Sequence, residues 1–193
     1  MRKIIMMNWV SVDGFFAGPN GEIDWMVRDP EVDQALREPA PGQPRLESQG
    51  SDTMLLGHTT YSLFENSWPQ IATDPNAPEA LHKMAEEVNR MTKIVFSQTR
   101  PGVTWENSKL VRGNLIEEVK KLKQSDGSPI LIFGSGTIVQ QLSKEKLIDE
   151  YLLVVTPVVL GKGKPLFKDV EKLNLTLVHA RPFKSGNVLL RYR

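Results

Sequence analysis

The distribution of apolar residues constrains the fold of this chain more than any other feature. Short runs rich in Val, Ile and Leu recur along the sequence and are separated by stretches with helical spacing. This alternation is typical of an α/β sheet whose central strands are buried on both faces. The predicted strands are residues 3–10, 53–57, 93–97, 129–133 and 150–157.

The segments between these strands have the spacing of amphipathic helices. One apolar stripe ends just before the strand at 93 and consists of Leu81, Met84, Val88 and Met91. A second helix is predicted over residues 115–122, with Asn114 as its N-cap and Glu117 in the capping-box position. A third helix is predicted to begin at Ser135 and to bury Ile138, Val139 and Leu142.

The last third of the chain changes character. Residues 173–181 and 187–192 are strand-forming runs joined by turn residues, which predicts an antiparallel hairpin at one edge of a mixed sheet. The proline-rich segments 38–51 and 68–78 are predicted to be surface loops. The 193 residues contain no internal repeat and no interdomain linker, so we expect a single domain spanning 1–193.

Composition narrows the classes of function. The chain has no cysteine, which excludes disulfides, thiolate metal sites and cysteine nucleophiles. A net charge of +1 with interspersed signs argues against nucleic acid or an anionic membrane as partner. The three histidines are too far apart for a close-spaced metal motif, so no metal is expected. The first apolar run is too short to span a bilayer, and we expect a cytoplasmic protein.

A glycine-rich segment follows one of the buried strands. Gly134-Ser135-Gly136-Thr137 lies directly after the run 130–133 and directly before a predicted helix. Glycine lets the backbone approach a ligand closely, and the free N–H groups of a helix start favour a phosphate or diphosphate. The same residues would also serve as a tight turn, and the sequence leaves both interpretations open.

Two further strand ends carry polar residues. Gly57-His58-Thr59-Thr60 repeats the order of strand, glycine and helix start, and two such starts at neighbouring strand ends would suit a dinucleotide. Threonine is also a common N-cap for stability alone. Ser97-Gln98-Thr99-Arg100 offers hydroxyls and a guanidinium that fit either a phosphate monoester or a solvated turn.

Two aspartates lie in the loops after the first strand. Asp13 precedes Gly14, and Asp24 precedes Trp25. A carboxylate at this place could orient a nitrogen heterocycle, with the indole beside it. Asp-Gly is equally a common turn dipeptide, so the structural interpretation of Asp13 stays open as well.

Taken in order, these motifs resemble the dihydrofolate-reductase-like superfamily. Within it, the chain is most similar to the branch of the C-terminal reductase domain of the bifunctional riboflavin-biosynthesis deaminase-reductase. The resemblance rests on S-x-D-G at 11–14, L-L-G-x-x-T-Y at 55–61, I-V-F-S at 94–97, G-S-G-T at 134–137 and T-P-V-V-L-G-K-G-K-P-L-F at 156–167. It implies an α/β fold with a mixed, mostly parallel sheet of about eight strands, flanking helices and an antiparallel C-terminal hairpin.

The resemblance also implies a function. It is that of an NADPH-dependent reductase acting on a nitrogen heterocycle, either 5-amino-6-(5-phosphoribosylamino)uracil of riboflavin biosynthesis or a dihydrofolate-type substrate. The implied cofactor-binding residues are Trp9, Trp25, Gly57, His58, Thr59, Thr60, Ser97, Gln98, Thr99, Gly134, Ser135, Gly136, Thr137 and Ile138. Asp13 and Asp24 are the candidate catalytic carboxylates. Relatives commonly pair, so we expect a homodimer. The apolar segments 158–160 and 188–190 fit either a two-fold contact or core strands.

The chain departs from the family pattern at several positions. Dihydrofolate reductases usually have Arg where His58 stands, which implies that the cofactor phosphate is held more weakly or by Arg100. Riboflavin-pathway reductases carry a substrate-binding Glu where this chain has Phe133. This second departure motivates an alternative, an NADP(H)-binding sensor or scaffold without turnover. Asp29 and Glu31 lie near the place of the acid that dihydrofolate reductases use.

Overall fold

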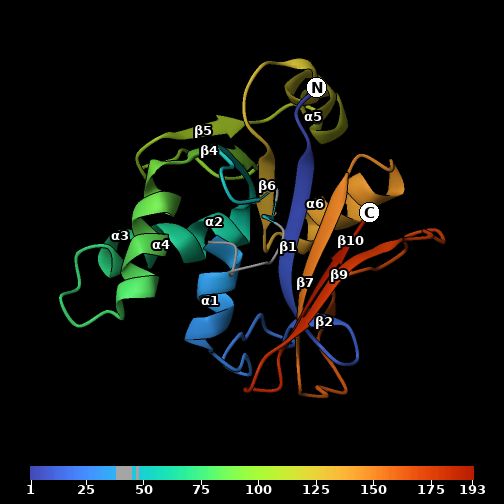
Figure 1. Ribbon diagram of the computed structural model, residues 1–193. Helices are drawn as coiled ribbons and strands as arrows, with labels where there is room; N and C mark the ends of the chain where they lie inside the picture. Colours follow the sequence, from blue (N-terminus) through green and yellow to red (C-terminus); the bar gives the residue numbers. More distant parts are fainter. Residues whose placement is uncertain (38–44, 47) are drawn as a thin grey trace.

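The core of the protein is a twisted sheet of eight strands. The computed structural model describes residues 1–37, 45–46 and 48–193. The strands of this sheet are β1 (Ile4–Ser11), β3 (Thr53–Gly57), β4 (Thr92–Phe96), β5 (Ser108–Val111), β6 (Ile130–Phe133), β7 (Glu150–Thr156), β9 (Leu177–Pro182) and β10 (Val188–Tyr192). Their order is β5-β4-β3-β6-β1-β7-β10-β9 (Figure 1). A separate antiparallel pair consists of β2 (Phe15–Ala17) and β8 (Lys164–Pro165).

Strand β1 lies in the middle of the sheet and is buried over its whole length. It pairs in parallel with β6 on one side and with β7 on the other. The strands β3, β4 and β5 continue the parallel part, whereas β10 and β9 are antiparallel. The predicted mixed, mostly parallel sheet is therefore confirmed. The six parallel strands all end at the same edge, which is where open α/β sheets bind ligands.

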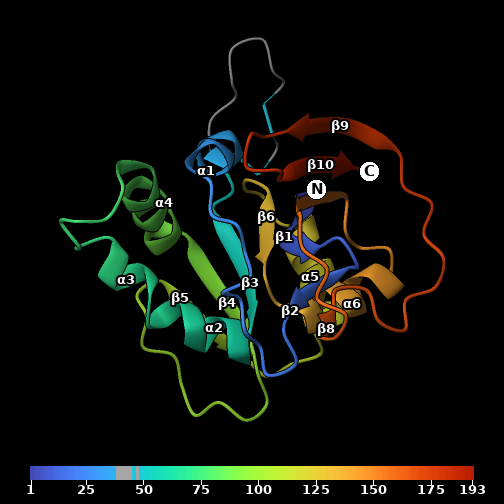
Figure 2. The same cartoon turned by 90° about the horizontal axis from the view of Figure 1, so that it is seen from below.

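Helices cover both faces of the sheet. On one face lie α1 (Pro30–Arg37), α2 (His58–Glu65), α3 (Trp68–Ile71) and α4 (Glu79–Arg90), and on the other lie α5 (Leu115–Gln124) and α6 (Gly136–Lys144) (Figure 2). Strand side chains alternate between the faces, so that Met7 packs toward α1–α4 and Met6 packs toward α5 and α6. Within the described ranges, no helix is long and apolar enough to cross a membrane.

The predicted helices are present with the predicted caps. The side-chain oxygen of Asn114 accepts hydrogen bonds from the backbone N–H groups of Ile116 and Glu117, at 2.9 and 3.2 Å. The apolar stripe of α4 is buried at Met84, Val88 and the C-cap Met91, and half-buried at Leu81. Ser135 is the N-cap of α6.

Two predicted boundaries are wrong. The hairpin strand starts at Leu177 and not at residue 173, because its partner β10 ends at Tyr192 and leaves the earlier residues without a strand to pair with. The segment 68–78 begins with α3, because Pro69 sits in the first helical turn, where a missing N–H costs no hydrogen bond. The predicted loop 38–51 lies largely outside the described residues.

The two apolar segments that fit either a dimer contact or core strands differ in exposure. Val159 is 70% exposed, whereas Leu189 is 2% exposed and belongs to the core. The homodimer itself stays a prediction.

Lys93 is a lysine enclosed in the core. Its side chain is fully buried, its ammonium donates to the carbonyl of Asn89 at 2.7 Å, and it lies 4.2 Å from the centre of the Trp105 ring. Burial lowers the pKa of Lys93 from 10.5 to about 8, although the charge of Glu106 acts in the opposite direction. Between these two pKa values the folded state binds fewer protons than the unfolded state, so folding becomes more favourable as the pH rises.

We therefore compare the free energy of unfolding of the unaltered protein with that of the variant Lys93→Met. The difference between the two should shift in favour of the unaltered protein from pH 8 to pH 10. The expected gain is about 1–3 kcal/mol, because one pKa unit corresponds to about 1.4 kcal/mol. Urea denaturation of both proteins at pH 7.5, 8.5, 9.5 and 10 measures it. Parallel pH curves for the two proteins would show that the ammonium is not disfavoured by its surroundings.

Candidate functional site

Two helix starts lie side by side at the carboxyl edge of the sheet. Strands β3 and β6 are parallel neighbours, and each leads directly into a helix, α2 and α6. The hydroxyl of Ser135 accepts a hydrogen bond from the backbone N–H of Gly57 at 3.1 Å. The backbone N–H of Ser135 donates to the hydroxyl of Thr60 at 3.0 Å. The structure thus brings together the predicted segments 57–60 and 134–138.

The first turns of α2 and α6 have no side-chain cap. Gly57 has no side chain, and the hydroxyl of Ser135 accepts no hydrogen bond from α6, in contrast to the side chain of Asn114 at the start of α5. Thr60, which the sequence allowed as a stabilising cap, instead reaches across to the neighbouring segment. Uncapped N–H groups at a helix start favour an anion, since the peptide dipoles place partial positive charge there. Two such helix starts side by side fit the diphosphate of a dinucleotide.

The backbone between β6 and α6 is held in an unusual conformation. Gly134 and Ser135 both have positive φ, 67° and 52°. The amide of Asn8 is buried on β1 and donates to the carbonyl of Gly134 at 3.1 Å. The sequence analysis gave Asn8 no role. The signal that could have revealed it is a polar residue in the middle of a strand that is buried on both faces.

Residues 97–99, the third predicted phosphate segment, follow β4 and contact the segment 57–60. Ser97 lies beside His58, with 3.3 Å between the hydroxyl and Nδ1 of the imidazole. The side-chain amide of Gln98 donates to the carbonyl of Arg112 at 2.6 Å, whereas Thr99 is exposed.

The guanidinium of Arg100 does not extend toward the side chains of Ser97, Gln98 and Thr99. It is paired with Glu65, donates to Ser62 at 2.7 Å and to the carbonyl of Gly102 at 2.8 Å, and lies over the ring of Tyr61. The expectation that Arg100 replaces the arginine of dihydrofolate reductases is therefore wrong. Its charge is already neutralised inside the protein.

Asp13 joins two loops at the same edge of the sheet. Its carboxylate accepts from the hydroxyl of Ser11 at 2.6 Å and from the backbone N–H groups of Leu160 and Gly161 at 3.1 and 2.7 Å. The hydrogen bond from Ser11 lowers the pKa of Asp13 most, desolvation opposes it, and the hydrogen bonds from the backbone N–H groups of Leu160 and Gly161 lower the pKa further. Asp13 is therefore ionised at neutral pH and holds the segment 158–161 to the end of β1.

The two predicted tryptophans lie on different parts of the edge. Trp9 is buried on β1 and stacks on Phe133, with 6.0 Å between the ring centres. Trp25 is half-buried against the core, and its indole N–H donates to the carbonyl of Glu22 at 3.0 Å. Phe133 also contacts Phe64 and Trp68, so the position of the family's glutamate is occupied by an aromatic cluster.

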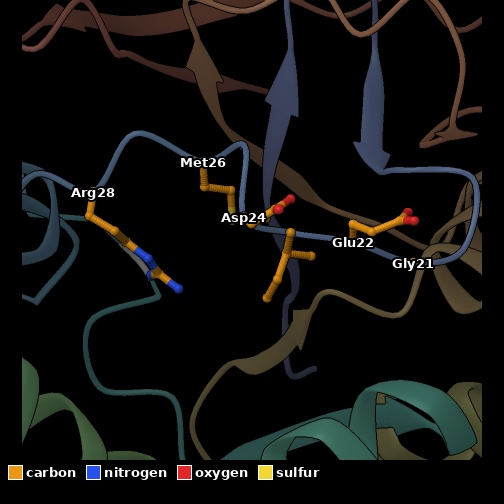
Figure 3. Close-up of a pocket in the computed structure, with 6 residues that line it drawn as sticks. Gly21, Glu22, Asp24, Met26 and Arg28 are labelled. Carbon is orange, nitrogen blue, oxygen red and sulfur yellow. The ribbon is translucent and has the colours of Figure 1, made fainter.

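A hollow of about 550 Å³ lies beneath the loop that contains Asp24 (Figure 3). Its lining residues are Gly21, Glu22, Ile23, Asp24, Met26 and Arg28. In Figure 3, Arg28 extends from one end of the loop, and the carboxylates of Asp24 and Glu22 lie toward the other. The hollow therefore has residues of opposite charge at its two ends, although the carboxylate of Glu22 already accepts hydrogen bonds from Asn20.

Helix α1 supplies a carboxyl that the sequence analysis missed. Burial raises the pKa of Asp33, and the nearby charge of Arg28 opposes this rise only in part. The neighbouring Asp29 is occupied: it accepts from the backbone N–H of Glu31 at 2.8 Å and from the hydroxyl of Ser185. Asp33 thus lies in surroundings that disfavour its ionised form, and the charge of Arg28, which lines the hollow, acts on it.

The chain matches a known protein family over almost its whole length. The RibD C-terminal domain family matches residues 2–189 of the chain. The protein YyaP of Bacillus subtilis (strain 168), itself uncharacterized, is 35% identical over 192 residues, which cover 99% of this chain and 94% of YyaP.

Solved structures show the same fold. The diaminohydroxyphosphoribosylaminopyrimidine deaminase/5-amino-6-(5-phosphoribosylamino)uracil reductase of Thermotoga maritima aligns with a TM-score of 0.63 at 15% identity. The alignment covers 100% of this chain and 56% of that one. The dihydrofolate reductase of Enterococcus faecalis, solved with NADP(H) and RAB-propyl, aligns with a TM-score of 0.62 at 12% identity, covering 99% and 95% of the two chains.

Gly136 offers a direct test of this edge. The ring of Phe16 on β2 lies so close to Gly136 that an added Cβ would overlap it well inside van der Waals contact. We expect Gly136→Ala to lower the free energy of unfolding by about 1–3 kcal/mol, because the ring or the helix start must shift. Urea denaturation measures this change.

Gly102→Ala is the matched control. Nothing lies within 4 Å of a Cβ at Gly102, so its free energy of unfolding should change by less than about 0.5 kcal/mol. Equal effects of the two substitutions would contradict the close packing of Phe16 on α6.

Proposed function

The chain belongs to the RibD C-terminal domain family, and on this premise we propose that it is an NADPH-dependent reductase of a nitrogen heterocycle. The substrate we propose is of the 5-amino-6-(5-phosphoribosylamino)uracil or dihydrofolate type. The observation that carries the proposal is the pair of uncapped helix starts at the ends of β3 and β6. They form a site for a diphosphate at the sheet edge where this fold is expected to bind its ligands.

The residues at this edge fit a dinucleotide. The first-turn N–H groups at Thr59, Thr60 and Thr137 would bind the diphosphate, and Ser135 fixes the distance between the two helix starts. The buried ring of Trp9 and the half-buried ring of Phe133 would shield one side of the reacting groups from water. When bound, the nicotinamide supplies the hydride.

Three carboxyl groups near the edge take different roles in this proposal. Asp24 orients the substrate from the rim of the hollow. Asp33, with its raised pKa, holds the proton that the reduced heterocycle requires. Asp13 is committed to Ser11, Leu160 and Gly161 and positions the loops.

A second function is favoured by the aromatic cluster. Phe133 packs against Trp9, Phe64 and Trp68 where riboflavin-pathway reductases hold a substrate-binding glutamate. A protein with this replacement could bind NADP(H) without turnover and act as a sensor or scaffold.

Titration with NADPH, followed by a substrate screen, separates these functions. We expect binding with a micromolar Kd, about −8 kcal/mol, seen as quenching of tryptophan fluorescence. We also expect oxidation of NADPH in the presence of a pyrimidine of the riboflavin pathway or of dihydrofolate. Binding without turnover of either would support the second function, and absence of binding would contradict both.

Replacement of Asp33 tests its role in proton transfer. We expect Asp33→Asn to lower kcat by about 100-fold, as is typical for loss of a general acid, with little change in the Kd for NADPH. The kcat of the unaltered protein should fall as the pH rises through the raised pKa of Asp33, and the variant should lack this fall. Glu31→Gln, on the exposed side of the same turn, is the control and should retain full activity. An unchanged kcat in Asp33→Asn would remove Asp33 from the mechanism.

A further inference from the structure

By the family resemblance, Ser97, Gln98 and Thr99 are expected to lie beside the adenosine 2'-phosphate of the cofactor, and these three residues carry no positive charge. This segment begins where β3 and β4 end side by side, with Gly57 paired to Phe96 in the parallel register. His58 and Ser97, the residues that follow, meet at 3.3 Å. They are the polar side chains that this contact presents to a ligand bound over the two strand ends.

Two arginines beside this segment, Arg100 and the exposed Arg112, make hydrogen bonds within the protein. Arg100 is bound to Glu65, and its side chain is only 13% exposed. Arg112 donates to the carbonyls of Gln98 and Arg100, at 3.0 and 2.7 Å, and so braces the loop after β4. Release of Arg100 to meet a phosphate would leave Glu65, which is 14% exposed, without its counter-charge.

The three segments at the sheet edge supply no other positive side chain. Residues 57–60, 97–99 and 134–138 contain neither lysine nor arginine, and Thr137 stands exposed in the first turn of α6. The diphosphate can still be bound, because backbone N–H groups recognise it. A 2'-phosphate, with nearly two negative charges, usually requires an arginine, whose planar guanidinium binds phosphate through two hydrogen bonds.

We propose that this protein binds NADPH and NADH with similar affinity and that His58 is the residue that sets the remaining preference for NADPH. The inference rests on the proposed function, since it concerns the cofactor of the same site. The resemblance implies NADPH as the cofactor, and the preference for NADPH over NADH is the property that this inference addresses. His58 and Ser97 offer hydrogen bonds to the 2'-phosphate without the fixed charge of a guanidinium.

Isothermal titration calorimetry with NADPH and NADH tests this inference without measuring activity. For the unaltered protein at pH 8 we expect the two Kd values to differ by less than about tenfold. His58→Arg should strengthen binding of NADPH by about tenfold or more and leave NADH unchanged, because a charged hydrogen bond to phosphate is worth about one to two decades in affinity. His58→Ala should remove the remaining preference.

Two further variants serve as controls. Gln34→Arg adds the same charge on the exposed side of α1 and should leave the ratio of the two Kd values unchanged. Arg100→Gln should also leave this ratio unchanged, whatever its effect on stability, since Arg100 is bound to Glu65.

The outcomes separate this inference from the proposed function. A preference for NADPH above about 100-fold in the unaltered protein, or its loss in Arg100→Gln, would overturn the inference and leave the reductase proposal standing. Absence of binding to both dinucleotides would contradict the proposed function and the inference with it.

Discussion

The parallel pairing of β1 with β6 and β7 is the constraint on which the rest of the structure depends. Both neighbours run in the same direction as β1, so helices must return the chain across the faces, and every parallel strand ends at one edge. Burial of all eight β1 residues fixes the register, because a slip by one residue would exchange the two faces of the strand. The position of Asn8 below Gly134 follows from this register, and with it the shape of the turn into α6.

The two helix starts are coupled by reciprocal hydrogen bonds. Ser135 accepts from Gly57 and donates to Thr60, so a displacement of either segment would break both bonds. The rigid sheet thus presents a preformed pair of first turns, in which little conformational freedom is left to lose on binding. The pKa values of Asp13 and Asp33 shift in opposite directions for local reasons: hydrogen bonds from Ser11 and from backbone N–H groups stabilise the ionised form of Asp13, and burial disfavours the ionised form of Asp33.

The sequence was sufficient for features that depend on local pattern and insufficient for those that depend on distant contacts. The apolar runs predicted β1, β3, β4, β6 and β7, and Asn114 followed by Glu117 predicted a cap, because burial and capping depend on neighbouring residues. Strands β2, β5 and β8 are short and only partly buried, and four of the eight residues of α1 are polar, so none gave a clear pattern. The pairing of Arg100 with Glu65 spans 35 residues, and no local signal reveals it.

The site combines a strong and a weak means of recognising anions, and the two differ in origin. Backbone N–H groups at a helix start depend on the fold and tolerate almost any side chain, so the diphosphate site persists while individual residues change. Recognition of an additional phosphate depends on single side chains, of which His58 and Ser97 are the ones in place. The guanidinium of Arg100 is paired with Glu65 and lies over the ring of Tyr61. Its positive charge, which could distinguish NADPH from NADH, therefore stabilises the protein and is not presented to a ligand. Affinity and selectivity for a dinucleotide can therefore be lost separately in this fold, since the first resides in the backbone and the second in a few side chains.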